Sequence, residues 1–159
     1  MEGLIAIFDY KSEAVRKVIE AIKFGFNRDL IGDILLGWRL PKKFRKIALV
    51  PVPLHRLREN WRGFNQAELI AKQMGKKMAP VRGLVRTRAT GQQARTVNRG
   101  MRAENIKGAF GLGKEGEGLS GKRVILIDDV FTSGVTMREC ARVLRKAGVK
   151  QVWGLVLAR

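Results

Sequence analysis

The chain has 159 residues, and its 32 lysines and arginines against 14 aspartates and glutamates give a formal net charge of +18. Such an excess of cations favours a polyanionic partner (nucleic acid, a phosphorylated small molecule or an anionic lipid surface), although a solvated basic surface would explain it as well. The length fits one domain, no apolar run approaches the roughly 20 residues that span a bilayer, and the single cysteine, Cys140, excludes intramolecular disulfides and cysteine-rich zinc sites, so we expect one cytoplasmic domain over residues 1–159.

The first third of the chain predicts a strand followed by two helices. Residues 4–10 are a short apolar strand, and Ser12 offers a helix N-cap. Apolar residues then recur with helical spacing over residues 15–22 and again over residues 29–38, with Pro41 just beyond.

The next segments predict a strand, a polar segment and a third helix. Residues 47–53 form an apolar run that its two prolines end, and the polar residues 54–66 follow. Asn65 and Glu68 have the spacing of a capping box at the start of a helix that continues to residue 78.

The middle of the chain is the least regular part. Residues 81–86 and 106–112 predict two short strands, and residues 86–102, which lack a hydrophobic period, predict an exposed mobile loop between them. The glycine-rich residues 111–121 predict a flexible connector. Their G-x-G-x-x-G match opens no apolar helix, so we reject it as a dinucleotide-binding motif.

The last third predicts strand, helix and strand. Residues 122–129 are apolar without alternation until two acids, which indicates a strand buried on both faces, as in a parallel sheet. A helical stripe over residues 137–144 ends before Gly148, and residues 151–158 are a final buried strand. Strands alternating with helices predict a doubly wound α/β fold with a mostly parallel sheet.

The end of the strand at residues 122–129 carries the most chemical information. In open parallel sheets, ligands bind outside the carboxyl ends of the strands. The turn at residues 132–136 would gather backbone N–H groups, hydroxyls and a helix N-terminus into an anion cradle. Asp128 and Asp129 would repel a bare phosphate, so we expect them to face hydroxyl groups or a divalent cation. A sugar phosphate meets both needs.

A plainer interpretation exists for the same residues. Asp128 and Asp129 would then only end a strand, and Thr136 with Glu139 would only cap a helix. Cys140 lies on the apolar stripe of that helix and is expected to pack in the core. His55 is the only histidine, and a lone histidine in a basic segment is more often solvated than catalytic.

Residues 124–136 resemble the phosphoribosyl-pyrophosphate-binding signature of type I phosphoribosyltransferases: an apolar strand, paired acids, two apolar residues, and small hydroxylated residues around glycine. Phe131 departs slightly, since many members carry an aliphatic residue there. A narrower resemblance, carried by residues 8–24, 49–71, 86–110 and 124–149, is to the ComF-like competence family. Many relatives carry an N-terminal four-cysteine zinc module that this chain is expected to lack.

The resemblance implies a type I phosphoribosyltransferase fold with a small mobile hood at about residues 81–110, and it implies Mg²⁺ as cofactor. Asp128 and Asp129 match the acids that meet the ribose hydroxyls, directly or through Mg²⁺. The 5′-phosphate loop is matched by Thr132, Ser133, Gly134, Val135 and Thr136. The pyrophosphate side and hood would use Pro53, His55, Arg56, Arg88, Gln92, Arg99, Arg102 and Asn105, and arginine suits pyrophosphate because its planar fork binds oxygens bidentately.

Two functions follow as expectations. The first is a Mg²⁺-dependent phosphoribosyltransferase-like protein that binds phosphoribosyl pyrophosphate or a ribose-5-phosphate nucleotide and acts in bacterial competence. The second is a non-catalytic protein of DNA uptake that binds single-stranded DNA or a competence helicase. Trp61 and Phe64 among arginines favour base stacking, but a helix-start staple beside a solvated face explains them equally well.

Overall fold

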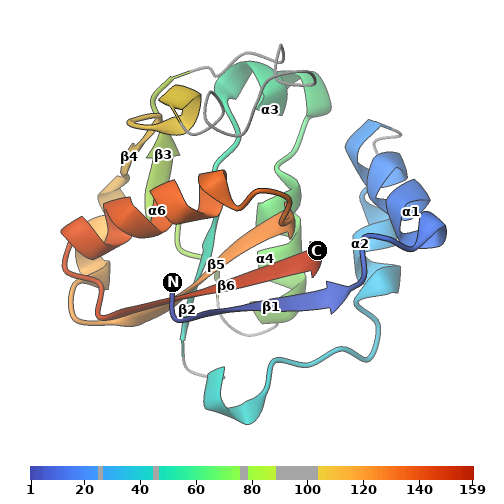
Figure 1. Cartoon of the computed structure of the whole chain (residues 1–159), viewed down its shortest axis with the longest axis horizontal. Helices are drawn as coiled ribbons and strands as arrows, with labels where there is room; N and C mark the ends of the chain where they lie inside the picture. The colour runs from blue at the N-terminus through green and yellow to red at the C-terminus, as the bar shows by residue number, and fades with distance from the viewer. Residues whose placement is uncertain (25–26, 45–46, 76–78, 89–103) are drawn as a thin grey trace.

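The computed structural model describes residues 1–24, 27–44, 47–75, 79–88 and 104–159. Its centre is a four-stranded parallel sheet in the order β1-β6-β5-β2 (Figure 1). The strands are β1 (Gly3–Phe8), β2 (Ala48–Pro51), β5 (Arg123–Val130) and β6 (Gln151–Ala158). A separate antiparallel pair, β3 (Leu84–Arg86) with β4 (Phe110–Leu112), lies in the predicted hood, and both strands are shorter than predicted.

Helices cover both faces of the sheet, and the side chains of β5 show why its sequence does not alternate. Val124 and Leu126 join the core beneath α6 (Val135–Lys146). Ile125 and Ile127 join the opposite core, against α1 (Glu13–Phe24), α2 (Asp29–Ile34) and α4 (Gln66–Gly75). Both faces of β5 are therefore buried, which confirms the predicted doubly wound α/β fold.

Two helical segments differ from the prediction. Helix α3 (Arg56–Arg62) forms in the polar segment for which no helix was predicted, and His55 caps it by accepting a 3.3 Å hydrogen bond from the Leu57 N–H at Nδ1. Helix α2 ends at Ile34 rather than near Trp38. In the described part of the chain, no helix has both the length and the apolar character needed to cross a membrane.

The segment predicted as a flexible connector instead contains a 3-10 helix, Lys114–Leu119, with Leu119 buried. A side chain at Gly116 would overlap the carbonyl oxygen of Gly83, so this glycine permits close packing against the backbone just before β3. Composition indicated flexibility here, but Gly113 and Gly116 allow close backbone contact.

Half of the predicted capping box forms at α4. The Asn65 side chain accepts a 3.0 Å hydrogen bond from the Ala67 N–H and donates a 3.0 Å hydrogen bond to the Val52 carbonyl. Glu68 pairs with Arg82 at 2.9 Å instead of closing the box. Asn65 thereby ties the chain after β2 to the start of α4, which fixes the position of residue 52 relative to that helix.

Candidate ligand site at the carboxyl ends of the sheet

Asp128 and Asp129 lie at the carboxyl end of β5, which points toward the side of the molecule where α1 lies (Figure 1). The backbone N–H of Asp129 donates a 2.9 Å hydrogen bond to Asp128 Oδ1. Lys23, near the end of α1, places its Nζ 3.1 Å from Asp129 Oδ2. These two side chains are 22% and 17% exposed, so their ion pair is partly shielded from solvent.

The two carboxylates sit in an environment that resists their joint ionisation. Burial raises the pKa of Asp128 to about 7, and the negative charge of Asp129 adds to that rise. The hydrogen bond from Asp129 and the positive charges of Lys23 and Arg86 act in the opposite direction. A hydroxyl donor or a cation at Asp128 would relieve this unfavourable negative charge.

The acid pair fits Mg²⁺ better than it fits a metal held by protein ligands alone. Among the residues that the structure describes, no group of three or more histidine, cysteine or acidic side chains could hold a metal ion. Mg²⁺ is usually bound by one or two carboxylates together with substrate phosphates and water. Asp128 and Asp129 can supply the protein's share of such a shell.

Two arginines lie near the acids, and the sequence predicted neither of them as a neighbour of Asp128 or Asp129. Arg62 on α3 feels the charge of Asp129, and Arg86 on β3 feels the charge of Asp128. Burial lowers the pKa of both guanidinium groups, and these acids oppose that change. Together with Lys23, they surround the acids with cations from α1, α3 and β3, segments far apart in the sequence.

The turn after β5 is shaped by Gly134. Its φ of 71° lies in the left-handed region, and it is the N-cap residue of α6 without a side-chain capping bond. The first N–H groups of a helix lack intrahelical acceptors, so the start of α6 offers donors beside Thr132, which is exposed, and Ser133 and Thr136, which are half-buried. The alternative of a capping box at Thr136 is wrong, because Gly134 occupies the N-cap position.

An open cavity of about 760 Å³ borders this turn. Two guanidinium groups lie over the ring of Phe131, with the Cζ atoms of Arg138 and Arg159 at 6.0 and 5.7 Å from its centroid. Hydroxyls of the turn, several cations and two glutamates line this cavity. Its lining residues are Glu104, Lys107, Phe131, Thr132, Ser133, Val135, Arg138, Glu139, Arg142 and Arg159.

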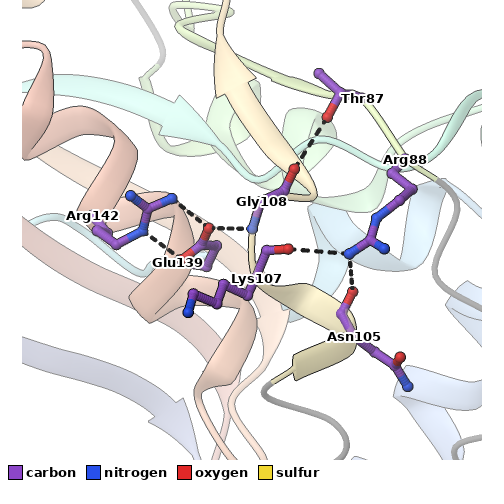
Figure 2. Close-up of polar contacts among 7 residues, drawn as sticks. All are labelled: Thr87, Arg88, Asn105, Lys107, Gly108, Glu139 and Arg142. Carbon is purple, nitrogen blue, oxygen red and sulfur yellow. Dashed lines mark hydrogen bonds and ion pairs between the residues drawn. The ribbon is translucent and has the colours of Figure 1, made fainter.

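Glu139 on α6 binds the backbone of the hood at Gly108, as Figure 2 shows. Its Oε1 accepts a 2.7 Å hydrogen bond from the Gly108 N–H just before β4. Arg142 donates to both carboxylate oxygens, at 2.7 and 2.6 Å. These contacts lower the pKa of Glu139, with the bond from Arg142 as the largest cause. The wall of the cavity is therefore held by a charge-assisted network.

Arg88, a predicted pyrophosphate or hood residue, bridges the two ends of the hood (Figure 2). Its Nη2 donates 3.1 Å hydrogen bonds to the carbonyls of Asn105 and Lys107. In this arrangement Nη2 of Arg88 binds backbone, so the predicted contact with a ligand would fall to its Nε and Nη1 donors.

The other predicted residues fall into two groups. Pro53 and Arg56 line a second cavity of about 360 Å³ that also includes Arg86, while His55 uses Nδ1 to cap α3. The remaining three lie outside the described residues: Gln92, Arg99 and Arg102.

Comparison with known proteins gives a consistent picture. The family model for the phosphoribosyl transferase domain matches residues 61–159. Competence protein F of Haemophilus influenzae is 33% identical over 86% of this chain and 63% of that protein. The DNA utilization protein YhgH of Escherichia coli K12 is 29% identical over 97% of this chain and 71% of that protein. The chain thus spans about two thirds of the length of these relatives.

A solved structure shares the fold. Glutamine phosphoribosylpyrophosphate amidotransferase from B. subtilis superposes with a TM-score of 0.52 at 20% identity, over 87% of this chain and 30% of that chain. At this identity the likeness shows the fold alone. It agrees with the parallel sheet and the helices on both of its faces.

Proposed function

The chain belongs to the phosphoribosyl transferase domain family, and from this premise we propose that it binds phosphoribosyl pyrophosphate, or a nucleotide bearing ribose 5-phosphate, together with Mg²⁺. Its relatives named for competence and DNA utilization support a competence-related role for this phosphoribosyltransferase-like chain. We propose that it acts in the uptake and use of DNA.

The observation that carries the proposal is the pairing of opposite chemistries at one strand end. The turn at residues 132–136 offers N–H groups and hydroxyls to the 5′-phosphate. In this proposal Asp128 and Asp129 face the ribose hydroxyls. A hydroxyl can donate a hydrogen bond to a carboxylate, whereas an ionised phosphate cannot. Lys23 could then bind either Asp129 or a phosphate oxygen of the ligand, so ligand binding would compete with the 3.1 Å ion pair between Lys23 and Asp129.

Turnover would place further demands on the same residues. Loss of pyrophosphate from C1 of the ribose develops positive charge on the ring and negative charge on the leaving group. Bound Mg²⁺ would neutralise part of the pyrophosphate charge. Arg62 and Arg86 would stabilise the rest of the departing anion, while Asp129 would lie toward the cationic ring.

Thermal unfolding tests the proposal. A ligand at about 100 times its Kd stabilises the folded state by about 2.7 kcal/mol, which corresponds to a rise of roughly 5–10 °C in Tm for a domain of this size. We expect this rise with phosphoribosyl pyrophosphate and Mg²⁺, and its loss in the Asp128→Asn, Asp129→Asn double variant. Asp33→Asn, an exposed acid on α2, is the matched control and should keep the shift. An unchanged wild-type melting curve at saturating ligand would refute the proposal.

A second candidate is a non-catalytic protein that binds single-stranded DNA or a helicase of the uptake machinery. One observation favours the DNA version: an open cavity of about 820 Å³ at the amino ends of β2, β5 and β6, opposite the acids. Its lining includes the exposed cations Lys122, Arg123 and Lys150 and, among the described residues, no carboxylate.

Salt dependence tests this second candidate. Each phosphate contact releases counterions, so the affinity for an oligothymidylate should fall steeply between low and high salt. Glutamate substitutions at Lys122, Arg123 and Lys150 should reduce both the affinity and the salt slope. Absence of binding at low salt would exclude direct DNA binding and leave the helicase as the partner to test.

A further inference from the structure

Two exposed aromatic rings lie together beside the acids. Phe24, the last residue of α1, is 47% exposed, and Trp61 on α3 is 60% exposed. Their ring centroids are 6.5 Å apart, with an angle of 61° between the planes. Large aromatic side chains are usually buried, so two adjacent rings open to solvent indicate a binding surface.

The sequence neighbours of both rings interact with Asp129. Lys23 precedes Phe24 and forms the 3.1 Å ion pair with Asp129. Arg62 follows Trp61, feels the charge of Asp129, and places its Cζ 5.5 Å from the centroid of the Phe24 ring. Figure 1 shows α1 and α3 on two sides of the end toward which β5 points. The aromatic pair therefore borders the candidate sugar-phosphate site.

Arg62 has a further property that points to a ligand. Its Nε is buried and has no hydrogen-bond partner among the described residues. A buried donor without an acceptor is costly, and a ligand oxygen between the aromatic pair and the acids would satisfy it. The cations Arg56 and Arg58 on the same helix favour an anionic occupant over an apolar protein segment.

We propose that Phe24 and Trp61 form a stacking subsite for the nucleobase of a ligand whose sugar phosphate is held by Asp128, Asp129 and the turn. This inference rests on the proposed function and specifies its ligand: a nucleoside 5′-phosphate, either free or at the end of a single strand. Stacking on aromatic faces tolerates every base, because each base has a π-face, so little discrimination among bases is expected.

The structure also decides between the aromatic residues that the sequence indicated. Phe64 is 7% exposed and packs in the core, so a base cannot reach its face. Trp61 is accessible, and its aromatic neighbour is Phe24 from a helix 37 residues earlier. Base stacking therefore remains an interpretation for Trp61 alone, whereas Phe64 has a packing role.

Calorimetric titration with and without a base tests the subsite. Wild-type protein is titrated, in Mg²⁺, with ribose 5-phosphate, adenosine 5′-monophosphate and a 5′-phosphorylated oligothymidylate. We expect at least one base-bearing ligand to bind about 5- to 150-fold more tightly than ribose 5-phosphate, which corresponds to one stacked base. The mononucleotide and the oligonucleotide distinguish a free nucleotide from a strand end.

Variants assign the gain to the two rings. The double variant Phe24→Ala, Trp61→Ala should lose the base-dependent gain and keep its affinity for ribose 5-phosphate, while Trp61→Phe should retain most of the gain. Leu36→Ala, at an apolar residue that is 85% exposed, is the matched control and should behave as wild type. Quenching of tryptophan fluorescence by the nucleotide, lost in Trp61→Phe, provides a second readout if the double variant does not fold.

The outcomes test the stacking subsite and the sugar-phosphate site separately. Equal affinity of wild-type protein for ribose 5-phosphate and both base-bearing ligands overturns the stacking subsite and leaves the sugar-phosphate site standing. A gain that survives in the double variant overturns the assignment to Phe24 and Trp61. Failure of both ribose 5-phosphate and phosphoribosyl pyrophosphate to bind wild-type protein refutes the proposed function itself.

Discussion

Replacing Gly134 with alanine should damage the turn in two separable ways. The residue has a φ of 71°, where an alanine side chain is strained by about 1–2 kcal/mol. The added Cβ would also overlap the ring of Phe131, whose Cε2 and Cε1 lie 2.6 and 2.9 Å from its position. Displacing a packed ring typically costs a further 1–3 kcal/mol, so we expect a total loss of about 2–5 kcal/mol.

Gly121 provides the matched control. Its φ of 70° is nearly the same, but a Cβ built there meets no atom within 4 Å. Gly121→Ala should therefore cost only the backbone strain of about 1–2 kcal/mol. The difference between the two variants isolates the contact with Phe131.

Urea unfolding of the two variants measures this difference, and the Phe131→Ala single variant with the Gly134→Ala, Phe131→Ala double variant completes a double-mutant cycle. Alanine at 134 should cost about 1–2 kcal/mol once the ring is absent. Equal destabilisation by Gly134→Ala and Gly121→Ala, or no recovery in the Phe131→Ala background, would refute the reasoning.

Three further predictions concern buried ionisable groups. Glu139→Gln should lower the free energy of unfolding in urea by about 1–3 kcal/mol, because the carboxylate binds Gly108 and Arg142. Folding lowers the pKa of Glu139, so the contribution of its carboxylate should vanish as the pH falls through the pKa of the folded state. A loss below about 0.5 kcal/mol, or one that does not depend on pH, would contradict this. The pKa of Asp128 is raised by folding from 3.8 to about 7, so without ligand or Mg²⁺ the folded state loses stability as the pH rises from about 4 to about 7. The Tm of Asp128→Asn should therefore rise relative to that of wild type between pH 4 and 8. Parallel pH profiles of Tm for the two proteins would exclude this raised pKa. Cys140 is fully buried and burial raises the pKa of its thiol, so a thiol reagent should modify it only after unfolding; rapid labelling of folded protein would contradict that burial.

The end of β5 could be predicted because its chemistry is contiguous in the sequence. An apolar strand, two acids, a small hydroxylated turn and a helix follow one another over residues 124–146, and the structure arranges them in that order. The parallel sheet was predictable for a related reason, since a strand buried on both faces cannot alternate.

The cations around the acids could not be predicted in the same way. Lys23, Arg62 and Arg86 come from three elements that only the tertiary fold brings to the end of β5. Each belongs to a segment with several similar cations, so composition alone does not single it out. The same limit applies to the aromatic pair, whose members Phe24 and Trp61 lie on different helices.

Local patterns misled where backbone packing decided the structure. The glycines of residues 111–121 indicated flexibility, but Gly116 packs against the carbonyl of Gly83 beside a 3-10 helix. Helix α3 buries none of its side chains, so no apolar stripe marks it in the sequence, and its cap, His55, is an uncommon capping residue.

A crystal structure of the protein soaked with phosphoribosyl pyrophosphate and Mg²⁺ tests the central claim most directly. The account predicts the 5′-phosphate against the backbone N–H groups of residues 132–136, and the ribose hydroxyls or a Mg²⁺ ion against Asp128 and Asp129. Phosphate bound instead at the opposite end of the sheet, near Lys122, Arg123 and Lys150, with the turn and the acids unoccupied, would contradict it.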